Sequence, residues 1–427
     1  MASVAKRLQL RSAALAACAL ASVHPAAAHA QSEPRLFTAD AFQLSGDIRL
    51  VAVDGERSWV DGGFGKLRSG SDGDFQLSPQ LGNLSLVWQP QFTFSFGATV
   101  VGSVQGGQRT EAGLSEAYLS FRPMRGTHTA FSARAGLMWP PVSLEHEGAD
   151  WHVADSITPS AINSWIGEEV RPIAGEATLA TDLGEHKLRA TAAVMVANDT
   201  SGTLLTFRGW ALHDRVTLAS NRQPLPPLGP VVGSFQPAFT HPLLDVHPGF
   251  ARHPGYYGKL SWQPPLPVRI ELFRYDNEAD PEDANQEMEW GWRTQFTNLS
   301  AVALLGGTTL KAQAMEGRTR MGFVMAGRRW IDCDFRSAFL LASHAIGPFS
   351  ITARGEAFET RNSGSIAGED YDEGGWALTV AGKRSWGPVT GKVELLHVSS
   401  RREDRDDVGL AQRQEQTQLQ AQMRIGW

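Results

Sequence analysis

The last eleven residues of the chain alternate between two kinds of side chain. One parity carries Thr417, Leu419, Ala421, Met423, Ile425 and Trp427, and the other carries three glutamines and Arg424, with Gly426. A period of two places these sets on opposite faces of a β-strand. One face therefore suits an apolar environment, while the other needs water or hydrogen-bond partners.

Similar alternation recurs along the chain, at residues 42–50, 91–100, 131–139, 187–196 and 349–356. Short connections rich in turn residues, such as Gly306-Gly307 and Gly347-Pro348, are interleaved with long polar or Pro-rich ones. The long connections are 54–75, 105–112, 140–172, 199–255, 276–288, 317–330, 361–374 and 399–414. Eight long and seven short connections predict about sixteen strands, with fourteen or eighteen as alternatives, because the strands near 256–263 and 317–344 show the weakest alternation.

The N-terminus indicates export. Lys6, Arg7 and Arg11 precede the small, apolar stretch 12–23, and Ala28-His29-Ala30 forms an A-x-A cleavage pattern. Residues 1–30 therefore read as a secretory signal peptide, although the residues before Cys18 also resemble a lipoprotein processing box. The remaining chain has 36 Lys and Arg against 45 Asp and Glu, and this acidic balance argues against a nucleic-acid partner.

The terminal Trp427 resembles the end of the closing strand in bacterial outer-membrane β-barrels, whose last residue is typically Phe or Trp. Thirteen Trp residues also suit a membrane with two polar interfaces. We therefore predict an all-β transmembrane antiparallel β-barrel of about 16 strands over residues 41–427, with long external loops and short periplasmic turns. Residues 31–40 would form a periplasmic segment. The competing fold is a large soluble all-β protein such as a propeller, but no blade-length repeat is visible.

If the residues of the apolar parity face lipid, the inward-facing residues carry a net positive charge, although the chain as a whole is acidic. Seven acidic residues share the inward parity: Asp47, Glu116, Glu176, Asp182, Glu271, Glu356 and Glu394. A basic wall would concentrate anions in a channel. The alternative is that inward Arg and Glu neutralise each other locally, as Arg354 could with Glu356. The fourteen cations predicted to line the pore are Arg49, Arg122, Arg134, Lys187, Arg189, Lys259, Arg269, Arg293, Lys311, Arg336, Arg354, Lys383, Lys392 and Arg424.

The third long connection, 140–172, is the candidate constriction, because a sixteen-strand barrel leaves an aqueous channel that something must narrow. An external cap outside the pore is the alternative. Acidic, His and Trp side chains in this loop would stand beside the basic wall. They are Glu145, His146, Glu147, Asp150, Trp151, His152, Trp165, Glu168, Glu169 and Arg171.

The segment from Arg134 to Glu145, which reads RAGLMWPPVSLE, resembles the strand-to-loop segment of the phosphate-selective (O/P-type) porins. The resemblance covers about a dozen residues and implies a porin; we predict a trimeric or monomeric diffusion channel. Phosphate selectivity in that family rests on Arg ladders and a Lys cluster, and residues 140–172 contain no Lys. The resemblance therefore supports a porin in general more strongly than a phosphate-selective porin.

Other motifs carry less weight. His241, His247 and His253 each precede Pro in a Pro-rich stretch, which suits an extended loop better than a metal site. No catalytic motif is present, so we expect no enzyme, metal or cofactor.

We predict an outer-membrane porin for small hydrophilic solutes with a tilt toward anions. The alternatives are a dedicated channel for one bulky solute, such as an acidic oligosaccharide, and a rim-active enzyme or adhesin. Expected partners are outer-membrane lipid, the solutes and the barrel-assembly machinery, with a homotrimer as one assembly.

Overall fold

The computed structural model describes residues 34–70, 76–106, 111–123, 126, 128–246, 254–366 and 370–427. Residues from Pro34 to Trp427 form one compact unit. The predicted signal peptide, residues 1–30, lies outside the described residues, as do His247 and His253.

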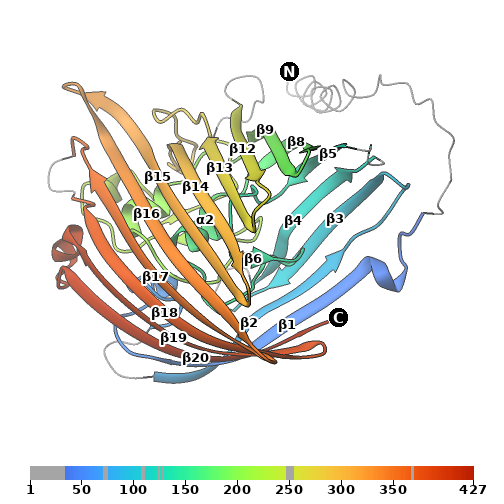
Figure 1. Ribbon diagram of the computed structural model, residues 1–427. Helices are drawn as coiled ribbons and strands as arrows, with labels where there is room; N and C mark the ends of the chain where they lie inside the picture. The colour runs from blue at the N-terminus through green and yellow to red at the C-terminus, as the bar shows by residue number, and fades with distance from the viewer. Residues whose placement is uncertain are drawn as a thin grey trace, which may run out of the picture. The chain divides into compact units, whose positions relative to one another are not determined.

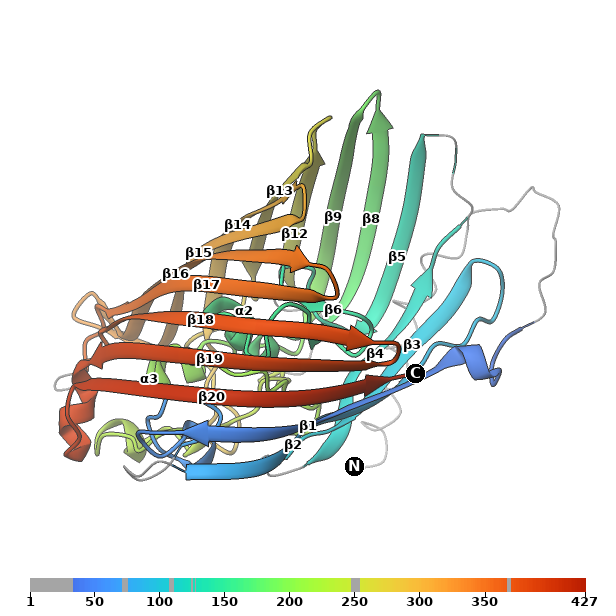
Figure 2. The same ribbon diagram turned by 60° about the horizontal axis from the view of Figure 1, so that its bottom comes forward.

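Sixteen antiparallel strands form a closed barrel (Figures 1 and 2), so the predicted fold and strand number are confirmed. The barrel closes where β1 pairs with β20, from Ser45 opposite Gly426 to Val53 opposite Gln418. In order, the strands are β1 (Phe42–Val53), β2 (Gln76–Trp88), β3 (Phe96–Val104), β4 (Ala112–Phe121), β5 (Thr129–Leu137), β8 (Ile173–Leu183), β9 (His186–Val196), β12 (Gly255–Gln263), β13 (Val268–Asp276), β14 (Arg293–Leu305), β15 (Thr308–Met325), β16 (Arg328–Ile346), β17 (Phe349–Asn362), β18 (Glu373–Trp386), β19 (Val389–Arg402) and β20 (Arg413–Gly426).

The polar side chains of the terminal strand face the interior. Gln420 is 4% exposed, whereas its neighbour Leu419 is 49% exposed. The same division holds along β17, where Arg354 is buried and Ile351 is exposed. A soluble barrel would show the opposite arrangement. A closed ring of strands with an apolar exterior satisfies its backbone hydrogen bonds internally and can cross lipid.

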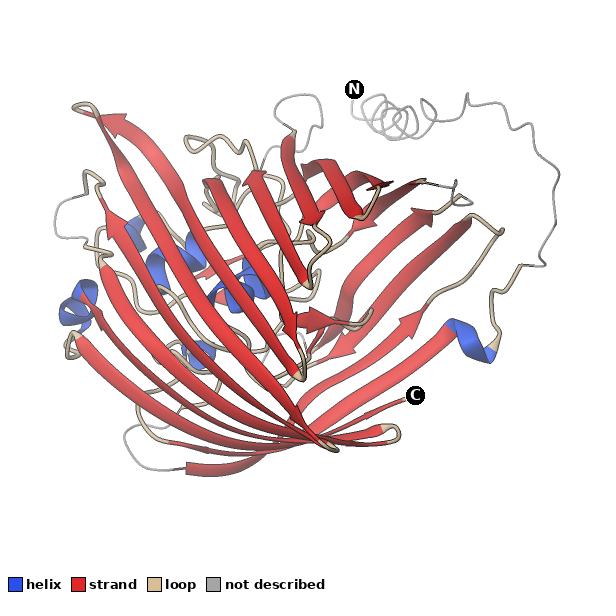
Figure 3. Ribbon diagram, viewed as in Figure 1, coloured by secondary structure: helices blue, strands red, loops and turns tan. Residues whose placement is uncertain are grey.

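The smaller elements lie in the connections between barrel strands, except for η1, which precedes β1 (Figure 3). None of the helices among the described residues has the length and apolar character needed to cross a membrane. The helices are α2 (Ala161–Glu169), α3 (Thr203–Arg208), and the 3-10 helices η1 (Ala39–Ala41), η2 (Trp59–Asp61), η3 (Val232–Ser234) and η4 (Glu403–Val408); β6 (His146–Glu147) pairs with β7 (His152–Val153), and β10 (Gln223–Pro224) pairs with β11 (Phe239–Thr240).

One predicted external connection is wrong. Residues 317–330 continue β15 and β16, which turn tightly at Ala326 and Gly327, both with positive φ (51° and 80°). A two-residue turn with positive φ at both positions matches the twist of the two strands. These strand residues were not recognised in the sequence because the outward face here carries charged residues such as Glu316 and Arg318. The usual difference in polarity between the inward and outward faces is therefore lost.

Connections from three parts of the chain pack together inside the barrel. Trp165 of α2 lies 5.4 Å from Phe296 on β14 and 5.2 Å from Phe335 on β16, measured between ring centroids. Trp210, from the connection after α3, and Leu67, from the connection after β1, join the same buried cluster. Part of the interior therefore has an apolar core, built by loops against inward-facing aromatic residues of the wall.

Candidate pore constriction

The third loop, residues 138–172, crosses the interior and is fastened to the far wall. The amide of Asn163 donates to Gln313 on β15 at 3.1 Å, and the backbone N–H of Ile157 donates to Glu394 on β19 at 2.6 Å. The backbone N–H of Ala161 donates to Glu356 on β17 at 2.7 Å. The loop therefore lies inside the barrel, bonded to strands on its wall.

Glu145 organises the start of α2. Ser160 caps the helix by accepting a hydrogen bond from the N–H of Asn163, and both the N–H and hydroxyl of Ser160 donate to Glu145. Arg354 on β17 forms an ion pair of 2.9 Å with Glu145. Burial alone would raise the pKa of Glu145, but Arg354, with the hydrogen bonds from Asn163 and Ser160, holds this pKa below its usual value.

The last turn of α2 joins the third loop to the connection after β9. Glu168 lies 2.7 Å from Arg208 and 3.2 Å from His213. Glu169 accepts from the backbone N–H groups of Gly202 and Leu204, at the start of α3, where donors lack helical partners. These two predicted constriction residues therefore act by holding loops together.

Arg171 and Trp165 have similar structural roles. The Arg171 guanidinium donates to the carbonyl oxygens of Ser115 and Thr217 and lies 4.8 Å from the Trp139 ring centroid. Burial lowers the pKa of Arg171 to about 9. Trp165 is buried in the apolar core, so neither side chain is placed to meet a solute.

The loop tip approaches the wall formed by β1 and β20. Asp150 binds Arg424 and accepts from the Ser45 hydroxyl at 2.7 Å. His152 lies 2.9 Å from the same carboxylate. Trp151, with φ of 52°, stacks against the ring of His146 at 3.6 Å between centroids. The neighbouring Glu147 is exposed and pairs with His152 in the β6–β7 hairpin.

A cavity of about 40 Å³ separates this tip from the wall. A space of this size holds a few water molecules at most. Its charged lining is balanced, with Arg49, Lys392 and Arg424 against Asp47, Asp150 and Asp214. Arg49 lies 2.6 Å from Asp47 and 2.5 Å from Asp214, so its charge is compensated.

Three lysines from separate strands meet at Asp155 of the third loop. The ammonium groups of Lys311 and Lys383 lie 2.8 and 3.6 Å from its carboxylate. Lys392 donates to the carbonyl oxygens of residues 153 and 156, at 2.6 and 2.8 Å. Burial would raise the pKa of Asp155, but the three lysines hold it below its usual value. We call Lys311, Lys383 and Lys392 the lysine cluster; two of its ammonium groups contact the carboxylate of Asp155, and the third donates to the loop backbone beside it.

Three other predicted pore cations occupy the inward parity together with acidic partners. Arg134 lies 2.8 Å from Glu176. Lys259 and Arg269 share Glu271, at 2.9 and 3.1 Å. The wall charge inferred from the sequence is therefore largely neutralised locally. Three further cations are exposed near short turns, namely Arg122, Lys187 and Arg189.

Two predicted pore cations, Arg293 and Arg336, point outward, and their assignment to the pore is wrong. On β14 the inward parity contains the buried Phe296, and Arg293 has the opposite parity. On β16 the inward parity contains the buried Phe335, while Arg336 is 66% exposed. We predicted that the polar parity of each strand faces the interior. On these strands aromatic residues line the inner wall instead, because they pack against α2.

Several residues of the site were missed in the sequence. Asp155 lies within the predicted constriction loop, but only the fold shows that lysines of β15, β18 and β19 converge on it. Asp214 lies in the connection between β9 and β12, after α3, and no local pattern there predicts a position inside the barrel. The available signal in the sequence was that this long connection contains residues that are usually buried, such as Trp210, which indicates that part of it packs inside the fold.

No protein-family model matches the chain, and no curated protein does. Among solved structures, it is similar to the anion-selective porin from Comamonas acidovorans (TM-score 0.52, 11% identity, covering 90% of this chain and 98% of that one). It is also similar to the outer-membrane channel DcaP of Acinetobacter baumannii (TM-score 0.54, 10% identity, covering 92% and 99%). At these identities the comparison concerns the fold. The chain has a porin-like fold and is an integral outer-membrane β-barrel.

Proposed function

We propose that this barrel is a porin, a passive diffusion channel for small hydrophilic solutes with a preference for anions. The observation that carries the preference is the lysine cluster around Asp155. The carboxylate of the nearby Glu394 accepts hydrogen bonds from the backbone N–H groups of Ile157 and Thr158. The excess positive charge faces a narrow, low-dielectric interior, where it attracts anions more strongly than in bulk water.

The narrow cavity at the loop tip favours small solutes over bulky ones. Its volume, about 40 Å³, is far below that of a sugar-binding pocket. The solutes we propose are inorganic anions and small carboxylates. A bulky solute such as an acidic oligosaccharide would require the third loop to move, against its many contacts with β15, β17 and β19.

The lysine cluster also bears on the resemblance to phosphate-selective porins. The sequence segment 134–145 suggested that family, but no loop lysine accompanied it. Here the wall strands supply the lysines to the loop instead. Phosphate is therefore one of the anions we propose to pass. We further propose a homotrimer in the membrane, with folding assisted by the barrel-assembly machinery of a Gram-negative cell.

The reversal potential of the purified full chain in a KCl gradient tests the anion preference. We expect the sign produced by chloride permeation. Replacing the lysine cluster (Lys311→Gln, Lys383→Gln and Lys392→Gln together) is expected to move the potential toward zero or reverse its sign. The matched control replaces Lys187 and Arg189, exposed near a short turn, with Gln, and should change the potential less. A cation-selective wild-type channel would contradict the proposed preference.

A further inference from the structure

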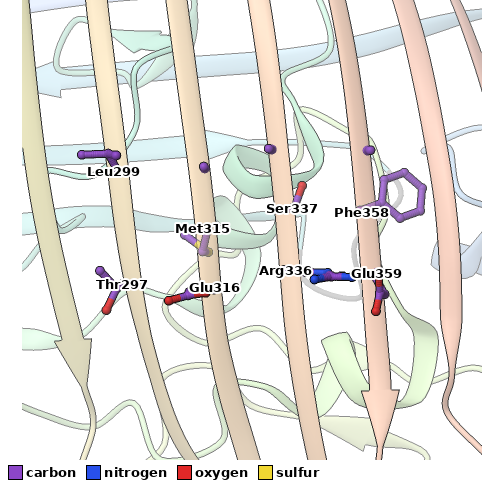
Figure 4. A pocket seen from close by; sticks show the side chains of 11 residues that line it. Thr297, Leu299, Met315, Glu316, Arg336, Ser337, Phe358 and Glu359 are labelled. Carbon is purple, nitrogen blue, oxygen red and sulfur yellow. Dashed lines mark hydrogen bonds and ion pairs between the residues drawn. The ribbon is translucent and has the colours of Figure 1, made fainter.

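The outer face of β14–β17 carries charged side chains where a membrane barrel is expected to be apolar. A row of outward residues runs in register across these strands: Thr297, Glu316, Arg336 and Glu359. Figure 4 shows these four side chains at one level, with Arg336 directed toward Glu359. The closest contact between that pair is 2.6 Å. Charges facing lipid are costly at the midplane, so this row needs a polar partner or a position near the interface.

Four arginines and three carboxylates line a hollow of about 490 Å³ around this row. Arg336 and Arg361 are 66% and 69% exposed, although both contact Glu359. Arg274 donates to the neutral acceptors Gln295 and Thr297, at 2.7 and 3.1 Å. A guanidinium has five N–H donors, so these side chains keep donors available for an external anion. The charged residues are Arg274, Glu316, Arg318, Asp334, Arg336, Glu359 and Arg361. We call this set the exterior arginine patch.

A second hollow, of about 550 Å³, adjoins the patch on the side nearer the short turns. Its floor consists of Ala314, Ala338 and Ala357, which lie opposite one another across three strands. The larger Leu299 and Trp376 stand at its two sides. The result is a trough of small apolar side chains that leads directly to arginines.

The patch lies near the outer boundary of the membrane. Ten residues separate Arg336 from Ile346, where β16 ends at a short turn. At about 3.4 Å per residue and a tilt of about 45°, this corresponds to about 24 Å, close to the height of the apolar band of an outer-membrane barrel. Trp376 stands beside the patch, while Phe349 is exposed at the opposite end of the band. Aromatic residues at both levels are typical of the two membrane interfaces.

We infer that the trough and the exterior arginine patch together bind an anionic lipid of the outer leaflet, with one acyl chain over the alanines and a phosphate at Arg336 and Arg361. The ligand class is an acylated, phosphorylated amphiphile. Arginine suits a phosphate because its planar donors bind two oxygens at once. The apolar trough accounts for the acyl chain, which a free phosphate ion would not need. If a second copy of the chain covered this face instead, it would have to place an apolar group over the trough and an anionic group against the exterior arginine patch.

Binding of bis-phosphorylated lipid A to the full chain in neutral detergent, counted by native mass spectrometry, tests this site. Arg336→Gln with Arg361→Gln is expected to weaken binding by about 30-fold. Ala338→Trp fills the trough without changing charge and should also weaken binding. The matched control is Arg401→Gln with Arg413→Gln, two outward arginines with exposures of 62% and 71% and acidic partners of their own. Heat-modifiable gel mobility verifies that each variant forms a closed barrel.

Several outcomes would overturn the inference. One is unchanged binding in the Arg336/Arg361 variant, and another is equal weakening in the control pair. Equal binding of lipid A without its phosphates would show that the patch is not used. Competition by millimolar inorganic phosphate with no effect of Ala338→Trp would indicate an anion site without a lipid chain. A change in oligomer mass of the lipid-free Arg336/Arg361 variant would assign this face to a second copy of the chain.

Discussion

Glu145 in the third loop and Arg354 on β17 are 209 residues apart in the sequence, yet they form a buried ion pair of 2.9 Å. Arg354 also lies 2.9 Å from Glu356 and donates to the carbonyl oxygen of Thr158 at 2.8 Å. One wall guanidinium thus fixes the beginning and the middle of the loop. The position of the third loop inside the barrel therefore depends on this attachment as well as on the barrel wall.

Arg354→Gln is expected to release the third loop from the wall. Removing one partner of a buried pair leaves uncompensated charges and costs about 3–5 kcal/mol. We therefore expect larger and noisier single-channel conductance than in the wild type. The control is Arg401→Gln, which removes an exposed arginine 3.5 Å from Glu403. Unchanged conductance in Arg354→Gln would show that the loop holds its place without this pair.

Asp155→Asn should increase the anion preference of the channel. The substitution removes the carboxylate at the centre of the lysine cluster and leaves the three ammonium groups in place. The reversal potential in a KCl gradient should move further toward the chloride limit. Asp334→Asn, on the outer face with 64% exposure, is the matched control. A shift toward cation preference would contradict the assigned role of Asp155.

The barrel could be predicted from the sequence, because a closed membrane sheet imposes a two-residue period that local residues reveal. Gln420 and Leu419 illustrate this, since each kind of side chain meets the environment its chemistry favours. The site could be predicted only in part. The lysine cluster depends on which strands become neighbours of one loop, and no local pattern encodes that. Arg336 was misplaced because aromatic residues replace polar ones on the inner wall where α2 packs.

Acidification should leave the ion pair between Glu168 of α2 and Arg208 of α3 intact until the pH is well below 4.5. Burial would raise the pKa of Glu168, but Arg208 and His213 lower it to about 2, from an ordinary value of 4.5. A lowered pKa in the folded state means that the stabilisation is fully present above 4.5 and is lost as pH falls toward 2. The part of the single-channel conductance that depends on this pair should therefore stay constant from pH 7 to about 4.5 and rise below that range as the pair is lost.

Glu168→Gln tests the origin of that pH dependence. We expect a raised conductance already at pH 7, because Arg208 loses its buried partner, and a smaller change on acidification. Glu415→Gln, with 51% exposure and a contact to Arg413, serves as the control and should follow the wild type. An identical acid response in Glu168→Gln and the wild type would assign the transition to another carboxylate.

Leu419→Arg tests which face of the terminal strand meets lipid. Leu419 is 49% exposed near the middle of β20, between the buried Gln418 and Gln420. An arginine facing lipid near the midplane is expected to cost about 2–4 kcal/mol of unfolding free energy. Leu419→Ala, which keeps the position apolar, should cost less. Urea unfolding in lipid vesicles, followed by Trp fluorescence, measures both. Equal stability of Leu419→Arg and the wild type would place water, not hydrocarbon, against this face.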